Sequence, residues 1–94
     1  MTYVHVTTSQ GRTMEDFRAV AAKLSPPYDI DGLLVRMVGS DAAGLHIVGI
    51  WESQAQAKRF EAEQLFPAFQ AATMPEPDTT TFAVFDADEV YIRR

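Results

Sequence analysis

The segment from Ile30 to Trp51 contains two runs of alternating residues in which both alternating sets are mainly apolar. Residues 30–38 and 45–51 are rich in branched and aromatic side chains, and the loop GSDAAG at 39–44 separates them, so the segment predicts a β-hairpin. A sheet with one wet face should alternate apolar with polar residues. Because this hairpin does not, we expect helices to cover one face and a second copy of the chain to cover the other, as a two-fold dimer.

The residues before the hairpin predict one strand and one helix. Residues 2–8 are rich in β-branched and aromatic side chains and precede the turn-like sequence SQG, which is typical of a strand. Thr13 is a favourable helix N-cap, and apolar residues recur at helical spacing from Met14 to Leu24. The SPP sequence at 25–27 should end this helix.

The residues after the hairpin predict a second helix and a last strand. Ser53 caps a helix whose largely apolar face includes Phe60, and Pro67 should kink or restart this helix because proline lacks an N–H. A linker then leads to a strand over residues 80–92. The order strand, helix, strand, strand, helix, strand predicts a ferredoxin-like α+β fold: a four-stranded antiparallel sheet with both helices on one face.

The totals of the chain restrict the classes of function. A length of 94 residues predicts a single domain, 1–94, and the absence of cysteine excludes disulfides and thiolate metal sites. The formal net charge is −5 and the eight basic residues are scattered, so nucleic acid is not an expected partner. No apolar run approaches ~18 residues and no signal peptide is evident, so we expect no membrane association and a cytoplasmic location.

Several stretches of the sequence resemble one superfamily. The element order and the sequences DGLLVRM, GLHIVGIWES and AKRFEAEQLFPAF resemble the dimeric α+β barrel proteins, in particular the antibiotic biosynthesis monooxygenase-like group. The resemblance spans nearly the whole chain. It implies a homodimeric barrel, and its members include cofactor-independent oxygenases of aromatic polyketides, haem-degrading enzymes, isomerases and cyclases.

The resemblance carries over to individual residues at few positions. Trp51 matches a tryptophan that lines the substrate cavity of the oxygenases, whereas apolar Ile47 stands where those enzymes often have asparagine. Haem-degrading relatives need a histidine on the helix after the tryptophan, and the sequence ESQAQAKRFEAEQLF has none. The resemblance therefore favours oxygenation, cyclisation or isomerisation over haem degradation.

Three residues are candidates for catalysis. His5 and His46 each lie mid-strand in strands that are adjacent in a ferredoxin-like sheet, so they could be cross-strand neighbours on one face, with one of them acting as general acid or base. The alternative is that each is a hydrogen-bonded core or interface histidine; neither has the spacing of a metal ligand. Arg36 interrupts an apolar run, either as an edge-strand charge or as a cation that stabilises an enolate or phenolate.

Four aromatic residues are candidates for substrate binding. Trp51 either fills the core or forms the wall of a cavity, since cavities open where strand ends meet helix starts. Tyr28 lies on the loop near the mouth of such a cavity, Phe60 lies on the apolar helix face, and Tyr3 supplies a second phenol. The alternative for both tyrosines is core packing.

The sequence thus predicts one apolar pocket per subunit, between sheet and helices, that receives a flat, hydrophobic small molecule. The expected chemistry is oxygenation without a cofactor, or cyclisation or isomerisation, of an aromatic or polyketide-like substrate. Trp51 would hold the substrate, Arg36 would stabilise its anion, and a histidine would move the proton. Cofactor and metal motifs are missing, so none is expected. A non-catalytic ligand-binding or structural barrel of the same fold is the alternative.

Overall fold

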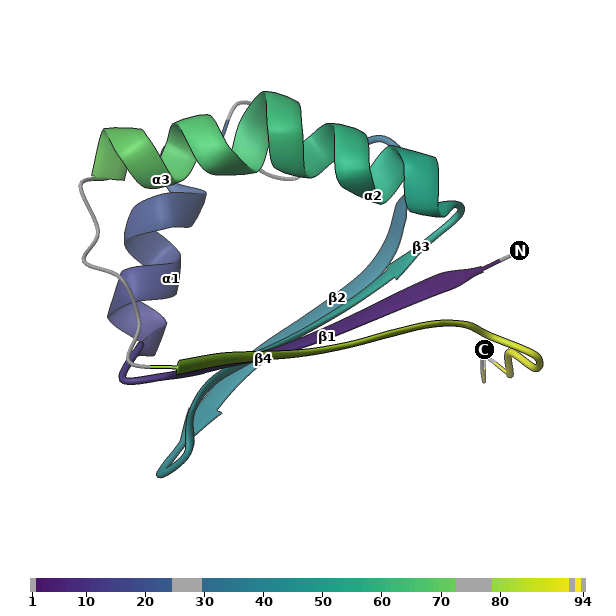
Figure 1. Ribbon diagram of the computed structural model, residues 1–94, viewed down its shortest axis with the longest axis horizontal. Helices are drawn as coiled ribbons and strands as arrows, with labels where there is room; N and C mark the ends of the chain where they lie inside the picture. The colour runs from purple at the N-terminus through teal and green to yellow at the C-terminus, as the bar shows by residue number, and fades with distance from the viewer. Residues whose placement is uncertain (1, 25–29, 73–78, 92, 94) are drawn as a thin grey trace.

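The predicted ferredoxin-like α+β fold is confirmed. The computed structural model describes residues 2–24, 30–72, 79–91 and 93. The sheet order is β2-β3-β1-β4, all neighbours are antiparallel, and Figure 1 shows the helices on one side of the sheet. The elements are β1 (Tyr3–Gln10), α1 (Met14–Ala21), β2 (Leu33–Asp41), β3 (Gly44–Trp51), α2 (Gln54–Phe60), the π-helical turn η1 (Glu61–Leu65), α3 (Phe66–Ala72) and β4 (Thr79–Asp86).

Both helical segments begin at the residues that the sequence marks as caps. The Thr13 hydroxyl accepts a hydrogen bond from the Asp16 N–H at 3.3 Å, and the Asp16 carboxylate accepts one from the Thr13 N–H at 2.9 Å, which forms a capping box. The Ser53 hydroxyl accepts from the Gln56 N–H at 3.2 Å. These bonds satisfy N–H groups that the first turn of a helix leaves unpaired.

The second helix changes its winding just before Pro67, as predicted. α2 gives way to η1 at Glu61, and α3 begins at Phe66. Pro67 cannot donate to the carbonyl four residues earlier, and its ring clashes with that turn. The wider π turn, closed by the Phe66 N–H on the Glu61 carbonyl, accommodates the proline without ending the helix.

The hairpin turn is tighter than predicted. β2 and β3 extend to Asp41 and Gly44, so two residues form the turn instead of the whole segment 39–44. Gly44 adopts a φ of +125°, and a Cβ there would collide with the backbone carbonyl of Ser9. Only glycine therefore allows β1 to approach β3 this closely at the turn.

Two elements are shorter than predicted. α1 ends at Ala21 instead of Leu24, and β4 ends at Asp86 instead of residue 92. β4 ends where β1 begins, because Asp86 pairs with Tyr3, and one further hydrogen bond, from the Ala87 N–H to the Thr2 carbonyl at 2.8 Å, follows this pair.

A β-bulge in β2 decides which of its side chains face the helices. Leu34 is the extra residue between the paired Leu33 and Val35. In a regular strand Leu33 and Val35 would share a face. The bulge instead places Leu33 and Arg36 together on the face that the helices cover.

The other face, here called the open face, is apolar and has no helix over it in the part of the chain that the structure describes (Figure 1). Met37 and Phe85 on this face are 56% and 53% exposed. In the part of the chain that the structure describes, no helix is both long and apolar enough to span a bilayer. The large apolar residues of the open face are Val4, Val6, Val35, Met37, Val48, Ile50 and Phe85.

Candidate ligand pocket

A pocket of about 670 Å³ lies between the helices and the covered face of the sheet, here called the sheet–helix pocket. Its volume falls in the range of small-molecule sites. Alternate residues of all four strands line one side, and residues of α1, α2, η1 and α3 line the other. The walls are mainly apolar and include Phe17, Val20, Leu33, Ile47, Trp51 and Phe60.

The pocket exists because the core is divided. One buried cluster, around Trp51 and Ala57, joins the start of α2 to the sheet, and another, around Val20 and Ala68, joins α3 to α1. Phe60 packs against both clusters. Protein interiors are normally filled to crystal-like density, so a space of this size between two core clusters is a feature that requires explanation.

Three residues form one cross-strand row in the wall that the sheet contributes. Arg36 on β2 and His5 on β1 both pair with Gly49 on β3, and all three line the pocket. Adjacent strands lie about 4.8 Å apart, so the Cα atoms of His5 and Arg36 are separated by roughly 10 Å. Gly49, between the two basic residues, has no side chain.

The indole nitrogen of Trp51 lies over Gly49. A Cβ built on Gly49 would be 2.9 Å from Trp51 Nε1. Trp51 is only 6% exposed, and within the described residues its N–H has no hydrogen-bond acceptor. The nitrogen atom itself is not fully buried, so an oxygen atom of a ligand in the pocket can accept a hydrogen bond from it.

Arg36 brings a positive charge to the same region. The side chain is half-buried, and its guanidinium carbon lies 5.2 Å from the ring centroid of Phe17, a cation–π contact. Within the described part of the chain it forms no salt bridge with a carboxylate. The charge is therefore available to an anionic group of a ligand.

Opposite Arg36, His5 lies beside a carboxylate that the sequence analysis missed. Its Nδ1 is 3.6 Å from Glu61 Oε1, and its Nε2 is 3.4 Å from Thr7 Oγ1. The imidazole also stacks on Phe82, with 5.8 Å between ring centroids. The sequence signal for its position was helical spacing, because Glu61 lies four residues after Ala57, which the helix buries against the sheet.

His46, the other predicted catalytic histidine, lies on the open face and does not line the pocket. The expectation that the two histidines are cross-strand neighbours on one face is wrong. His5 pairs with Gly49 and His46 with Thr8, so the register pairs odd residues with odd and even with even. Because facing alternates with period two, His5 and His46 fall on opposite faces.

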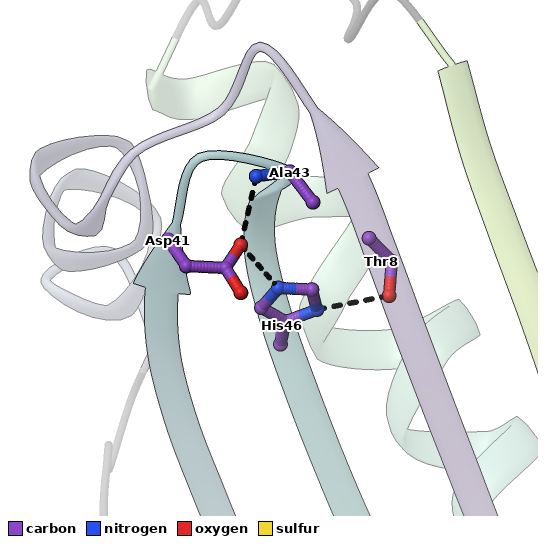
Figure 2. A network of polar contacts seen from close by, with 4 residues as sticks. All are labelled: Thr8, Asp41, Ala43 and His46. Carbon is purple, nitrogen blue, oxygen red and sulfur yellow. Dashed lines mark hydrogen bonds and ion pairs between the residues drawn. The ribbon is translucent and has the colours of Figure 1, made fainter.

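His46 is held by hydrogen bonds at both ring nitrogens (Figure 2). Its Nδ1 lies 3.0 Å from Thr8 Oγ1, and its Nε2 lies 2.8 Å from Asp41 Oδ1. The same Asp41 oxygen accepts a hydrogen bond from the Ala43 N–H at 2.8 Å. This network ties the hairpin turn to β1 and favours the structural alternative for His46.

The Asp41 network predicts a specific acid dependence. The hydrogen bond from His46, with that from the Ala43 N–H, lowers the pKa of Asp41 below its ordinary 3.8. A carboxyl group whose pKa is lowered in the folded state stabilises the fold fully above its unfolded-state pKa. This stabilisation is lost as the pH falls through the folded-state pKa. The difference in unfolding free energy between wild type and Asp41→Asn should be largest at neutral pH and shrink at strongly acidic pH, as measured by urea denaturation. A difference independent of pH would contradict this, and Asp88→Asn, at an exposed position, is the control.

The remaining predicted residues are distributed as follows. Phe60 lines the pocket and packs on Trp51, with ring centroids 5.5 Å apart. Tyr3 belongs to the buried cluster around Trp51 and is not among the lining residues. Tyr28 lies outside the described residues. Among those that are described, no group of three or more His, Asp or Glu side chains could hold a metal ion.

Comparisons with known proteins identify the fold. No family model and no curated protein matches the sequence. A "putative antibiotic biosynthesis monooxygenase" from Nitrosomonas europaea has a TM-score of 0.72 at 7% identity, over 93% of this chain and 90% of that one. A protein of the same description from Deinococcus radiodurans has a TM-score of 0.61 at 18% identity, over 100% and 99% of the two chains.

A third solved structure, described as a dimeric ferredoxin-like protein of unknown function from Thermobifida fusca, has a TM-score of 0.65 at 17% identity, over 93% of this chain and 92% of that one. Identities this low establish the fold and leave the activity open. They confirm, at the level of fold, the resemblance found in the sequence. The chain has the ferredoxin-like α+β fold shared by proteins described as antibiotic biosynthesis monooxygenases and by dimeric ferredoxin-like proteins.

Proposed function

We propose that the chain is a small-molecule enzyme of the antibiotic biosynthesis monooxygenase-like type, acting on a flat, hydrophobic aromatic or polyketide-like substrate in the sheet–helix pocket. The observation that carries the proposal is the row formed by His5, Gly49 and Arg36. It places a base and a cation on either side of Gly49, over which the N–H of Trp51 lies without an acceptor.

The common step that these residues support is removal of a proton from a weakly acidic substrate. His5 accepts the proton from a C–H or O–H bond, and the electron pair moves onto a conjugated oxygen. Arg36 and the Trp51 N–H stabilise the resulting oxyanion. The anion can be reprotonated at another carbon in an isomerisation, attack an internal carbonyl in a cyclisation, or react with molecular oxygen in an oxygenation. The proton transfer itself requires no cofactor.

The alternative is a ligand-binding protein without catalysis. It is favoured by the small number of polar groups in the pocket, whose walls are mainly apolar. Both functions require the same ligand site, and turnover of a bound compound would separate them.

Ligand binding can be measured with the chain's single tryptophan as the reporter. 1-Hydroxy-2-naphthoate, a flat anion, is expected to change the fluorescence of Trp51 saturably. Arg36→Gln should weaken its binding roughly tenfold, because a charged hydrogen bond contributes about 1.5 kcal/mol. Binding of uncharged naphthalene should be unaffected by the same substitution.

The control for this experiment is Arg18→Gln, which removes the same charge from an exposed position on α1. It should bind both probes like the wild type. Equal weakening of both probes by Arg36→Gln, or no saturable change of Trp51 fluorescence, would argue against an anion site in the pocket.

We further propose that two copies of the chain pair through the open face. A continuous apolar surface on a sheet is unusual for a monomer, and closed two-fold assembly would cover it in both copies at once. The description of the Thermobifida fusca protein as dimeric supports this proposal. Cytoplasmic location and the absence of a nucleic-acid partner remain predictions from composition and charge.

A further inference from the structure

Two local irregularities of the fold lie at the ends of the row across Gly49. The β-bulge at Leu34 puts Arg36 at one end of the row. The π turn η1 begins at Glu61, whose carboxylate lies beside His5 at the other end. Bulges and π turns each cost regular hydrogen bonding, and both occur often at functional sites. The proton transfer proposed above uses His5, Arg36 and Trp51, and it assigns no role to Glu61.

We infer that Glu61 is a positioning residue that fixes the tautomer of His5. Glu61 Oε1 lies on the Nδ1 side of the imidazole at 3.6 Å, within ion-pair range and longer than a hydrogen bond. A carboxylate there favours the proton on Nδ1, because its negative charge attracts the N–H dipole of the nearer ring nitrogen. Nε2 then carries the lone pair that accepts the substrate proton, so this inference rests on the proposed function for its catalytic meaning.

The environment of His5 supports this arrangement. Phe82 stacks on the imidazole and restricts its tilt, and the Thr7 hydroxyl can donate to Nε2 from 3.4 Å until a substrate replaces it. Both Glu61 and His5 are only partly exposed, with 32% and 21% of their side-chain surfaces accessible. Contacts of this kind are often long in free enzymes and shorten when the substrate binds.

Helical spacing explains how the carboxylate comes to lie there. Ala57 is buried against the cluster on the sheet. The N–H of Glu61 donates to the Ala57 carbonyl, so regular α-helical winding continues to Glu61 and places it one turn after Ala57, on the same side of the helix. The π turn, closed by the Phe66 N–H on the Glu61 carbonyl, follows this bond and rotates α3 relative to α2 without changing the direction of Glu61.

The tautomer of His5 is directly measurable by nuclear magnetic resonance. Long-range ¹H–¹⁵N spectra of the ¹⁵N-labelled protein, recorded without ligand and above the pH range in which imidazole is protonated, distinguish the two neutral forms. Wild-type His5 is expected to carry its proton mainly on Nδ1. Glu61→Ala should reverse this preference toward Nε2–H, and Glu61→Gln, which keeps an acceptor oxygen without the charge, should reduce it less.

Two controls separate positioning from a general structural effect. Glu63→Ala makes the same change at an exposed position of the same turn and should leave His5 as in the wild type. His46, which lies on the open face, should be unchanged in all three variants. If Glu61→Ala changes the His46 signal, that variant perturbs the sheet. The tautomers of His5 in the wild type and in Glu61→Gln then decide the result.

The inference is overturned if wild-type His5 is mainly the Nε2–H form, or if Glu61→Ala leaves its tautomer unchanged. The result does not depend on ligand binding. If the pocket binds no probe but the His5 tautomer responds as expected, the proposed function is overturned and this inference stands. If the pocket binds the probe but the tautomer does not respond, Glu61 has no role in the mechanism and the ligand site stands.

Discussion

Val48→Lys is expected to convert the protein from a pair of chains to single chains in dilute solution. Val48 pairs with Val6 on one side and Met37 on the other, so it lies in the middle of the open face. Lysine there would bury an unpaired charge, and two-fold symmetry would bring in two of them. Since like charges in an interface cost several kcal/mol, pairing should weaken roughly a hundredfold or more, as measured by sedimentation equilibrium.

Val84→Lys is the matched control for this experiment. Val84 pairs with His5 and therefore lies on the covered face of the sheet, where it is 52% exposed. The same charge at this position should leave two chains together. Two results would count against pairing through the open face: a wild-type protein with the mass of one chain, or a Val48→Lys variant that stays paired.

Gly49→Ala is expected to abolish most ligand binding and also to lower stability. The added Cβ would lie 2.9 Å from Trp51 Nε1, so either the indole or the strand has to move. Overpacking of this kind costs roughly 1–3 kcal/mol in the free energy of unfolding. Displacement of the indole also moves the N–H that is proposed to bind the ligand oxygen, so binding of 1-hydroxy-2-naphthoate should weaken roughly tenfold or more.

Gly39→Ala provides the comparison for this variant. A Cβ on Gly39 would have no neighbour within 4 Å, and the residue lies on β2 outside the pocket. Its stability and its probe affinity should match the wild type or exceed it slightly, because alanine reduces the freedom of the unfolded chain. If Gly49→Ala behaved like Gly39→Ala in both measurements, the space above Gly49 would have no role in binding.

The elements of this fold could be predicted because local signals determine them. Thr13 and Ser53 have side chains that cap helices, and Pro67 removes a hydrogen bond wherever it occurs in a helix. These signals need no knowledge of the partner elements. The apolar pattern of the hairpin likewise predicted strands that are apolar on both faces, and the structure confirms this.

The arrangement within the site could not be predicted, because it depends on register. A shift of one residue moves every side chain of a strand to the opposite face. The run LLV at 33–35 is apolar throughout, so nothing in it indicates that Leu34 bulges. The facing of Arg36 and the separation of His5 from His46 both depend on such register choices, which are made by packing between strands.

Glu61 illustrates a signal that the sequence contains and that the sequence analysis missed. It lies four residues after Ala57, so regular helical spacing places both residues on the side of the helix that meets the sheet. Its approach to His5 also requires His5 to lie on the covered face, and that depends on register.

A crystal structure with 1-hydroxy-2-naphthoate would test the central claim, that the sheet–helix pocket holds a flat, acidic ligand over Gly49. We expect the ring system between His5 and Arg36, with one of its oxygens within hydrogen-bond distance of Trp51 Nε1. An empty pocket with the probe bound on the open face, or a probe whose oxygens point away from Trp51 and Arg36, would contradict it.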